Sequence, residues 1–194
     1  MRITEKISHA AERKAFETIL DNLIQKGQTQ DVGQIANDLV NMVQKLHSDV
    51  WSEKSFQTLH MLANNPDGKW AHYVQRLIHD NDPYILKTFL TNAVYEGGIR
   101  GYHVAQETAK KYDINVPWLI LMDPTSACNL HCKGCWAAEY GNRLNLSFED
   151  MDRIVTEGEA LGIHWYMCTG GEPTCRKEDL FKLAAKHQNS VFHL

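Results

Sequence analysis

Apolar residues in the first part of the chain recur at intervals of three and four positions. This spacing places them on one face of an α-helix, with polar residues on the other faces. Two stretches show the pattern in full: Phe16, Ile19, Leu20, Leu23 and Ile24, then Val32, Ile35, Ala36, Leu39, Val40 and Val43. Further helical segments fit residues 52–63, 69–80, 84–96 and 102–111. The pattern predicts an all-α bundle over residues 1–113.

Turn-forming residues separate these helical segments. They occur as "NNPDG" at 64–68, "NDP" at 81–83 and "GG" at 97–98. Asn, Asp, Pro and Gly each favour turns, because they supply local hydrogen bonds, a fixed backbone angle or backbone freedom. We therefore expect the helices to break at these three places.

The pattern changes after residue 113, where short apolar runs alternate with amphipathic segments. Strand signals, rich in β-branched and aromatic residues, occupy 117–123 and 163–171 and begin again in "SVFHL". Between them, "LSFEDMDRIVTEGEALG" and "RKEDLFKLAAKH" indicate helices, the first with a capping-box-like start at Ser147 and Asp150. Alternation of strand and helix is typical of a parallel α/β domain. The predicted domains are residues 1–113 and 114–194.

Two unusual motifs follow the first two predicted strands. "CNLHCKGC" at 128–135 holds three of the five cysteines, and "TGGEP" stands at 169–173. In parallel α/β folds, functional residues gather at the carboxyl ends of the strands. Both motifs therefore fall where a functional site is expected.

Composition restricts the class of protein. Hydrophobic residues make up 43% of the 194 residues and charged residues 23%, so a packed core is expected. The net charge of −4 does not indicate a nucleic-acid partner. The charged start "MRITEKISHAAERK" argues against a secretory signal, and no apolar run approaches the ~20 residues that span a membrane. We expect a soluble, cytoplasmic protein whose clustered cysteines serve metal or redox chemistry.

The three cysteines of "CNLHCKGC" lie on a polar segment, so burial does not explain them. Cys168, inside a predicted strand, is expected to be a core residue, whereas Cys175 is left unassigned. Structural zinc takes four tetrahedral ligands, so His131, Cys168 or Cys175 would have to complete a zinc site. Cubane iron–sulfur clusters are normally held by four thiolates. Three thiolates would leave one iron open to a small molecule, which makes iron–sulfur the preferred interpretation.

"CNLHCKGC" resembles the C-x3-C-x2-C motif of the radical S-adenosylmethionine (radical SAM) superfamily. "GGEP" at 170–173 is similar to the glycine-rich motif that follows the second strand in that superfamily. By this resemblance, Cys128, Cys132 and Cys135 hold a [4Fe–4S] cluster. The fourth iron of the cluster is bound by the amino and carboxylate groups of S-adenosyl-L-methionine.

The resemblance also implies the residues that contact this cofactor. Gly170, Gly171 and Glu172 match the segment that contacts its methionine end. Glycine permits close backbone approach, and carbonyl and carboxylate oxygens accept hydrogen bonds from an ammonium group. An aromatic residue often precedes the third cysteine in the family and contacts adenine. Here Gly134 holds that place, and Trp136 is the candidate for the contact.

The resemblance implies a radical enzyme. An electron from the reduced cluster, supplied by a donor such as flavodoxin or ferredoxin, cleaves the carbon–sulfur bond of S-adenosylmethionine. The products are methionine and a 5′-deoxyadenosyl radical, which abstracts a hydrogen atom from a small-molecule or peptide substrate. Maturation of a peptide or cofactor and biosynthesis of a metabolite are tasks of this kind. The alternative is a structural zinc-binding module on a helical interaction domain.

The resemblance covers residues 117–194. The core of the family is usually a partial (βα)6 barrel, whereas this chain has room for two βα units and the start of a third strand. We therefore expect the N-terminal part of a longer enzyme, which alone does not cleave S-adenosylmethionine at a useful rate. The sequence of the helical segment does not choose between docking a substrate, a partner or a second subunit.

Overall fold

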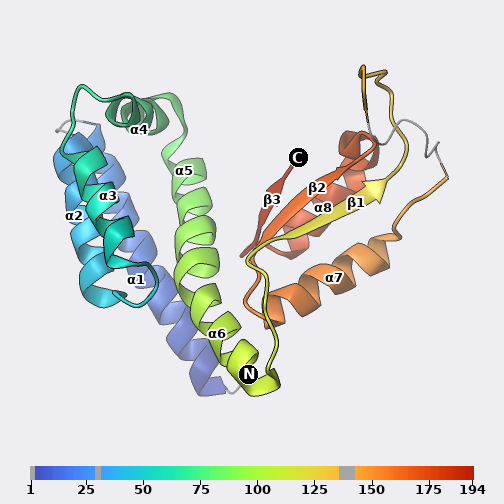
Figure 1. Cartoon of the computed structure of the whole chain (residues 1–194), viewed down its shortest axis with the longest axis horizontal. Helices are drawn as coiled ribbons and strands as arrows, with labels where there is room; N and C mark the ends of the chain where they lie inside the picture. Colours follow the sequence, from blue (N-terminus) through green and yellow to red (C-terminus); the bar gives the residue numbers. More distant parts are fainter. Residues whose placement is uncertain (1–2, 29–31, 136–142) are drawn as a thin grey trace. The chain divides into compact units, whose positions relative to one another are not determined.

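The computed structural model of the chain describes residues 3–28, 32–135 and 143–194 (Figure 1). The chain divides into two units, Met1–Thr91 and Asn92–Leu194, and each is described by itself. Within the described residues, the first unit is helical, and the second adds a small sheet to its helices. No helix in the described part of the chain is both long and apolar enough to cross a membrane.

The first unit contains the helices that the apolar spacing predicts. They are α1 (Ile3–Gly27), α2 (Val32–Leu46), α3 (Glu53–Ala63), α4 (Lys69–Asp80) and α5 (Pro83–Leu90). The predicted stripes supply the core, because Phe16, Leu20 and Ile24 of α1 are buried and so are Ile35 and Val43 of α2. The helical prediction for this part of the chain is confirmed.

Two of the three predicted breaks are confirmed, and each coincides with a helix cap. Helix α3 ends before Asn64, whose backbone N–H still bonds to the carbonyl groups of the last turn. Asp82 begins α5 by accepting hydrogen bonds from the backbone N–H groups of Tyr84 and Ile85, while Pro83 takes the first helical position. Proline suits that position because its missing N–H would have no partner inside the helix.

The third predicted break, at Gly97–Gly98, is wrong. Both glycines lie inside a π-helix, η1 (Thr91–Arg100), which leads into α6 (Gly101–Tyr112). A Cβ atom on Gly97 would lie 2.6 Å from Nε1 of Trp165. The missing side chain therefore serves close packing against the sheet rather than a turn.

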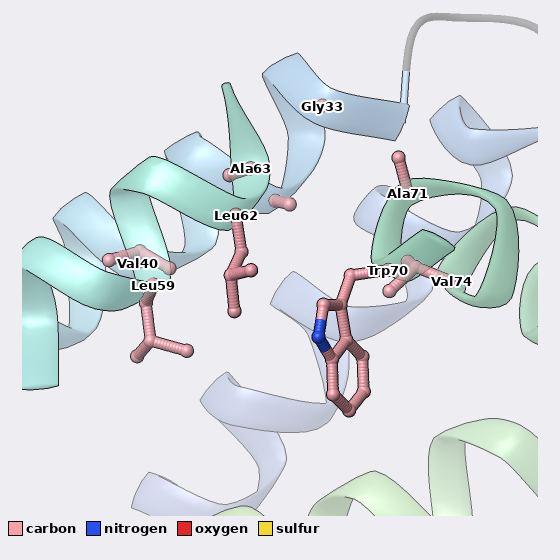
Figure 2. A pocket seen from close by; sticks show the side chains of 9 residues that line it. Gly33, Val40, Leu59, Leu62, Ala63, Trp70, Ala71 and Val74 are labelled. Atoms are coloured by element: carbon pink, nitrogen blue, oxygen red, sulfur yellow. The ribbon is translucent and has the colours of Figure 1, made fainter. Parts of the chain in front are cut away.

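An open hollow of about 150 Å³ lies between α2, α3 and α4 in the first unit. Its lining is almost entirely apolar and includes Val40, Leu62 and Trp70. Figure 2 shows Leu62 of α3 and the indole of Trp70 of α4 facing the same space. Part of the apolar stripe of α2 therefore faces this hollow rather than a fully packed core.

The second unit contains a parallel sheet of three strands in the order β1-β2-β3 (Figure 1). Its elements after α6 are β1 (Ile120–Thr125), α7 (Phe148–Ala160), β2 (Trp165–Gly170), the 3-10 helix η2 (Pro173–Arg176), α8 (Lys177–Lys186) and β3 (Val191–His193). The predicted alternation and α/β class are confirmed. Ser147 caps α7 as predicted, because its hydroxyl accepts a hydrogen bond from the N–H of Asp150 over 3.0 Å.

One face of this sheet packs against α7 and α8. Its buried cluster joins strand residues to helix residues: Met122, Tyr166 and Cys168 with Met151, Val155, Leu180 and Leu183. Cys168 is therefore a core residue, as predicted, and burial raises the pKa of its thiol to about 11. The residues that alternate with this set, such as the exposed Leu121 and Asp123, point to the other face.

The units divide between Thr91 and Asn92, whereas the sequence pattern changes near residue 113. The contacts of η1 and α6 explain the difference. The Asn92 side chain donates a hydrogen bond to the carbonyl of Gln188 over 2.8 Å. A Cβ on Gly101 would overlap the carbonyl oxygen of Gly162. These segments read as bundle helices in the sequence, yet they pack with the sheet-containing elements.

His164 is buried just before β2. Its Nδ1 lies 3.1 Å from the carbonyl oxygen of Asn189, and its Nε2 has no hydrogen-bond partner among the described residues. Burial lowers the pKa of this imidazole below its ordinary value; Glu96 and Glu159 oppose the shift, and Arg100 adds to it. The folded chain therefore holds His164 neutral and resists its protonation.

We expect acid to destabilise the chain through His164. The unfolded imidazole takes up a proton near its ordinary pKa of about 6.5, whereas the folded one does so only at lower pH. The stability that neutral His164 contributes is therefore fully present above the ordinary pKa. It is lost as the pH falls from there toward the lowered pKa of the folded state. Urea midpoints at pH 7.5 and pH 5.5 measure the loss. His164→Gln should be less stable overall but show a smaller loss, and equal losses in both proteins would contradict the assignment.

Candidate functional site

The three clustered cysteines lie on an exposed loop that follows β1. Cys128, Cys132 and Cys135 are exposed free thiols. The backbone N–H of Leu130 donates to Sγ of Cys128 over 3.4 Å. We call residues 128–135 the cysteine loop.

A tight turn joins the second and third cysteines. The N–H of Cys135 donates to the carbonyl of Cys132 over 3.2 Å, and Gly134 between them has a φ of +75°. The third residue of a type II turn needs such a positive φ, which glycine adopts without strain. This turn explains why glycine suits position 134, where the resembling family often has an aromatic residue.

The base of the loop is closed by pairing with the chain that returns toward α7. The N–H of Ser126 donates to the carbonyl of Leu144 over 2.7 Å, and the N–H of Leu146 donates to the carbonyl of Pro124 over 3.1 Å. Inside this base, the buried Thr125 hydroxyl donates to the side-chain oxygen of Asn145 and accepts from the N–H of Ala127. Both backbone and side-chain hydrogen bonds therefore fix residues 125–127, which we call the loop root.

The glycine-rich segment is joined to this loop root by backbone hydrogen bonds. Strand β2 ends at Gly170, and the N–H of Gly171 donates to the carbonyl of Thr125 over 2.9 Å. The N–H of Glu172 donates to the carbonyl of Ala127, directly before Cys128, over 2.8 Å. The structure thus brings the two predicted motifs to adjacent positions at one edge of the sheet.

Steric contact explains both glycines. Gly170 has a φ of +98°, and a Cβ on it would lie 2.8 Å from both Cβ of Asp123 and the carbonyl oxygen of Thr125. A Cβ on Gly171 would overlap the carbonyl of Ala127. Any side chain at Gly171 would therefore push this segment away from the loop root.

Glu172 is the N-cap of the short helix η2 and is half-buried. Its Oε1 accepts hydrogen bonds from the hydroxyl of Thr174 at 2.5 Å and from the N–H of Thr174 at 3.0 Å. Both bonds lower the pKa of the Glu172 carboxyl and so favour the carboxylate; the bond from the Thr174 hydroxyl has the larger effect. Beside it lies an open hollow of about 480 Å³, lined by residues 168–174 and Leu194.

Comparison with known proteins identifies this region. A sequence model of the radical SAM superfamily matches residues 122–194. Residues 122–194 belong to the radical SAM superfamily. Over 57 residues, the chain is also 44% identical to GTP 3′,8-cyclase of Geobacter sulfurreducens, a match that covers 27% of this chain and 18% of that enzyme. No solved structure matches the chain significantly.

The radical SAM family implies a [4Fe–4S] cluster and S-adenosylmethionine, and the donor chemistry of the loop fits a cluster. Three exposed thiols, one of which already accepts a backbone N–H, match the thiolate ligands that such clusters take. In the described residues, however, no three His, Cys, Asp or Glu side chains gather closely enough to hold a metal ion. Cluster binding would therefore have to draw the loop together, because ligand binding and loop ordering are coupled.

The other predicted site residues are placed differently. Trp136 lies outside the described residues. Cys168 is a core residue between the sheet and its helices, with 1% of its surface exposed. Cys175 is an exposed free thiol in η2, and its N–H bonds to the carbonyl of Glu172.

Sequence reasoning missed Arg176 and Thr125. The Arg176 guanidinium donates from Nη1 to the carbonyls of Pro124 and Leu146 and pairs with Asp179 at 2.7 Å. It therefore ties η2 to the end of β1 and to the entry of α7. The only sequence signal for Thr125 was its position just before a turn, where hydroxyls often bond the backbone two residues on.

Proposed function

We propose that this chain carries the cofactor-binding part of a radical SAM enzyme. In this proposal, Cys128, Cys132 and Cys135 bind three irons of a [4Fe–4S] cluster, and Gly170–Glu172 contacts the methionine end of S-adenosylmethionine. The observation that carries it is the pair of backbone hydrogen bonds from Gly171 and Glu172 to the loop root. They hold the cofactor-contacting segment against the cluster-binding loop.

The residues of the chain would bind and orient the cofactor. The carboxylate of Glu172 uses Oε1 for Thr174, which fixes its rotamer at the rim of the hollow. A carboxylate and neighbouring backbone carbonyls suit the ammonium group of a methionine moiety. When bound, the reduced cluster supplies the electron that splits S-adenosylmethionine into methionine and a 5′-deoxyadenosyl radical for hydrogen abstraction.

The features of the enzyme beyond this site are proposed from the family resemblance alone. They are a partial (βα)6 barrel that extends the three strands, a small-molecule or peptide substrate, an electron donor such as flavodoxin or ferredoxin, and a cytoplasmic setting. The three parallel strands with helices on one face are consistent with the start of such a barrel. The reaction type is then set by residues that line the substrate, since a fold alone does not specify it.

The metal content of the protein tests this function. After anaerobic reconstitution with iron and sulfide, we expect a brown protein with broad absorbance near ~400 nm and about four irons per chain. Addition of S-adenosylmethionine should change the electron paramagnetic resonance (EPR) spectrum of the reduced cluster, because the cofactor binds an iron directly. A colourless protein with one zinc per chain would instead establish the structural zinc module, with Cys175 the exposed candidate for the fourth ligand.

A further inference from the structure

Asp123 and Thr169 connect the ends of β1 and β2 on the face of the sheet away from α7 and α8. The Thr169 hydroxyl donates a hydrogen bond to Oδ1 of Asp123 over 2.7 Å. Asp123 is exposed, whereas its neighbours Met122 and Pro124 are buried. A carboxylate acceptor makes such a bond stronger than one between neutral groups. Asp123 lies before the cysteine loop and outside both motifs, whereas Thr169 is the first residue of "TGGEP" and precedes its glycines.

The pair spans an irregularity in the strand pairing. Met122 pairs with Cys168 and the next pair is Thr125 with Gly170, so β1 carries one extra residue there. A bulge of this kind disrupts the ladder locally, and Pro124 within it has no N–H to donate. The Asp123–Thr169 bond thus links the two strands at the point where backbone pairing is interrupted.

The path of β1 through this bulge decides where the loop root lies. Thr125 leaves the bulge and accepts the N–H of Gly171. The side chain of Asp123 also fills the space over Gly170, since its Cγ lies 3.1 Å from the place of a Cβ on that glycine. A shift of Asp123 would therefore move both partners of the backbone bonds that join the motifs.

We propose that Asp123 is a positioning residue that acts through Thr169 to hold Gly170–Glu172 against the loop root. The inference rests on the proposed function and extends it to Asp123, outside both motifs, and to Thr169, which precedes the cofactor-contacting segment. Asp123 contacts no cluster iron in this scheme. It sets the distance between the cofactor-contacting segment and the cysteine loop.

Thr169→Val tests the proposal, because it removes the hydroxyl donor and keeps the branched shape. In the metal-free chain, the amide hydrogens of Gly171 and Glu172 should exchange about tenfold faster, as expected for the loss of a charge-assisted hydrogen bond. In the reconstituted chain, the iron content should equal that of the unmodified protein. The EPR change caused by a fixed concentration of S-adenosylmethionine should be much smaller. Asp123→Ala should act in the same way.

Conservative variants separate positioning from general stability. Thr169→Ser and Asp123→Asn keep a donor and an acceptor, so both should restore slow exchange and most of the EPR change. Thr88→Val is the matched control, since its hydroxyl bonds only the carbonyl of Tyr84 in its own helix. Unchanged exchange in Thr169→Val, or faster exchange with an unchanged EPR response, would refute the inference. An unmodified chain without a cluster or without any S-adenosylmethionine response would instead refute the proposed function.

Discussion

Replacing any one of Cys128, Cys132 and Cys135 by Ala is expected to abolish the iron–sulfur absorbance of the reconstituted protein. Each thiolate binds a different iron of the proposed cluster, so two remaining thiolates cannot hold a cubane in water. The three cysteines are exposed, and their loss removes no core contact, so the variants should fold normally. Absorbance near ~400 nm and iron per chain measure the effect, and circular dichroism confirms the fold.

The two remaining cysteines provide the controls. Cys168→Ala should keep the colour, because that thiol is buried in the core and its pKa is raised, which disfavours the thiolate that a metal needs. It should lower stability by about 1 kcal/mol through the small cavity that it creates. Cys175→Ala should also keep the colour, whereas a loss of metal there would favour the zinc site. A full complement of iron in a Cys132→Ala chain would overturn the ligand assignment.

The fold could be predicted where local sequence and burial agree. The stripes of α1 and α2 and the caps at Asp82 and Ser147 depend on residues within a few positions, so the sequence already contains the signal. Gly97 and Gly98 could not be assigned in this way. Gly97 packs closely against Trp165, which lies far away in the sequence, and a glycine pair otherwise indicates a turn.

In the candidate site, too, the features set by local sequence could be predicted, and those set by tertiary contacts could not. The motif spacing predicted which residues gather at the sheet edge, since parallel strands bring their carboxyl ends together. It could not predict the bonds from Gly171 to Thr125 or from Arg176 to Pro124, because these depend on the bulge at Asp123–Pro124. The bulge adds one residue to β1 and so changes which carbonyl faces the glycines. Its only sequence signal is a proline within a strand.

Gly171→Ala should be the most damaging single substitution outside the cysteines. Its Cβ would overlap the carbonyl of Ala127, a backbone atom that cannot turn aside as a side chain can. The segment must then move away from the loop root, and the N–H groups of Gly171 and Glu172 lose their partners. Overpacking of this kind costs about 3 kcal/mol, and we expect a comparable fall in the free energy of unfolding. Iron loading should fall with it, because the loop root is no longer held.

Gly98→Ala is the matched control for this effect. A Cβ there would meet only the carbonyl of Ala93, at 3.4 Å, an ordinary contact, and alanine favours helical backbone. The chain should therefore keep its stability and its iron content. Gly134→Ala gives an intermediate case, since its Cβ would meet no described atom within 4 Å while its φ of +75° strains any side chain. A cost of about 1 kcal/mol is expected there. If Gly171→Ala matched Gly98→Ala in urea unfolding and iron loading, steric docking of the two motifs could not be what holds the site together.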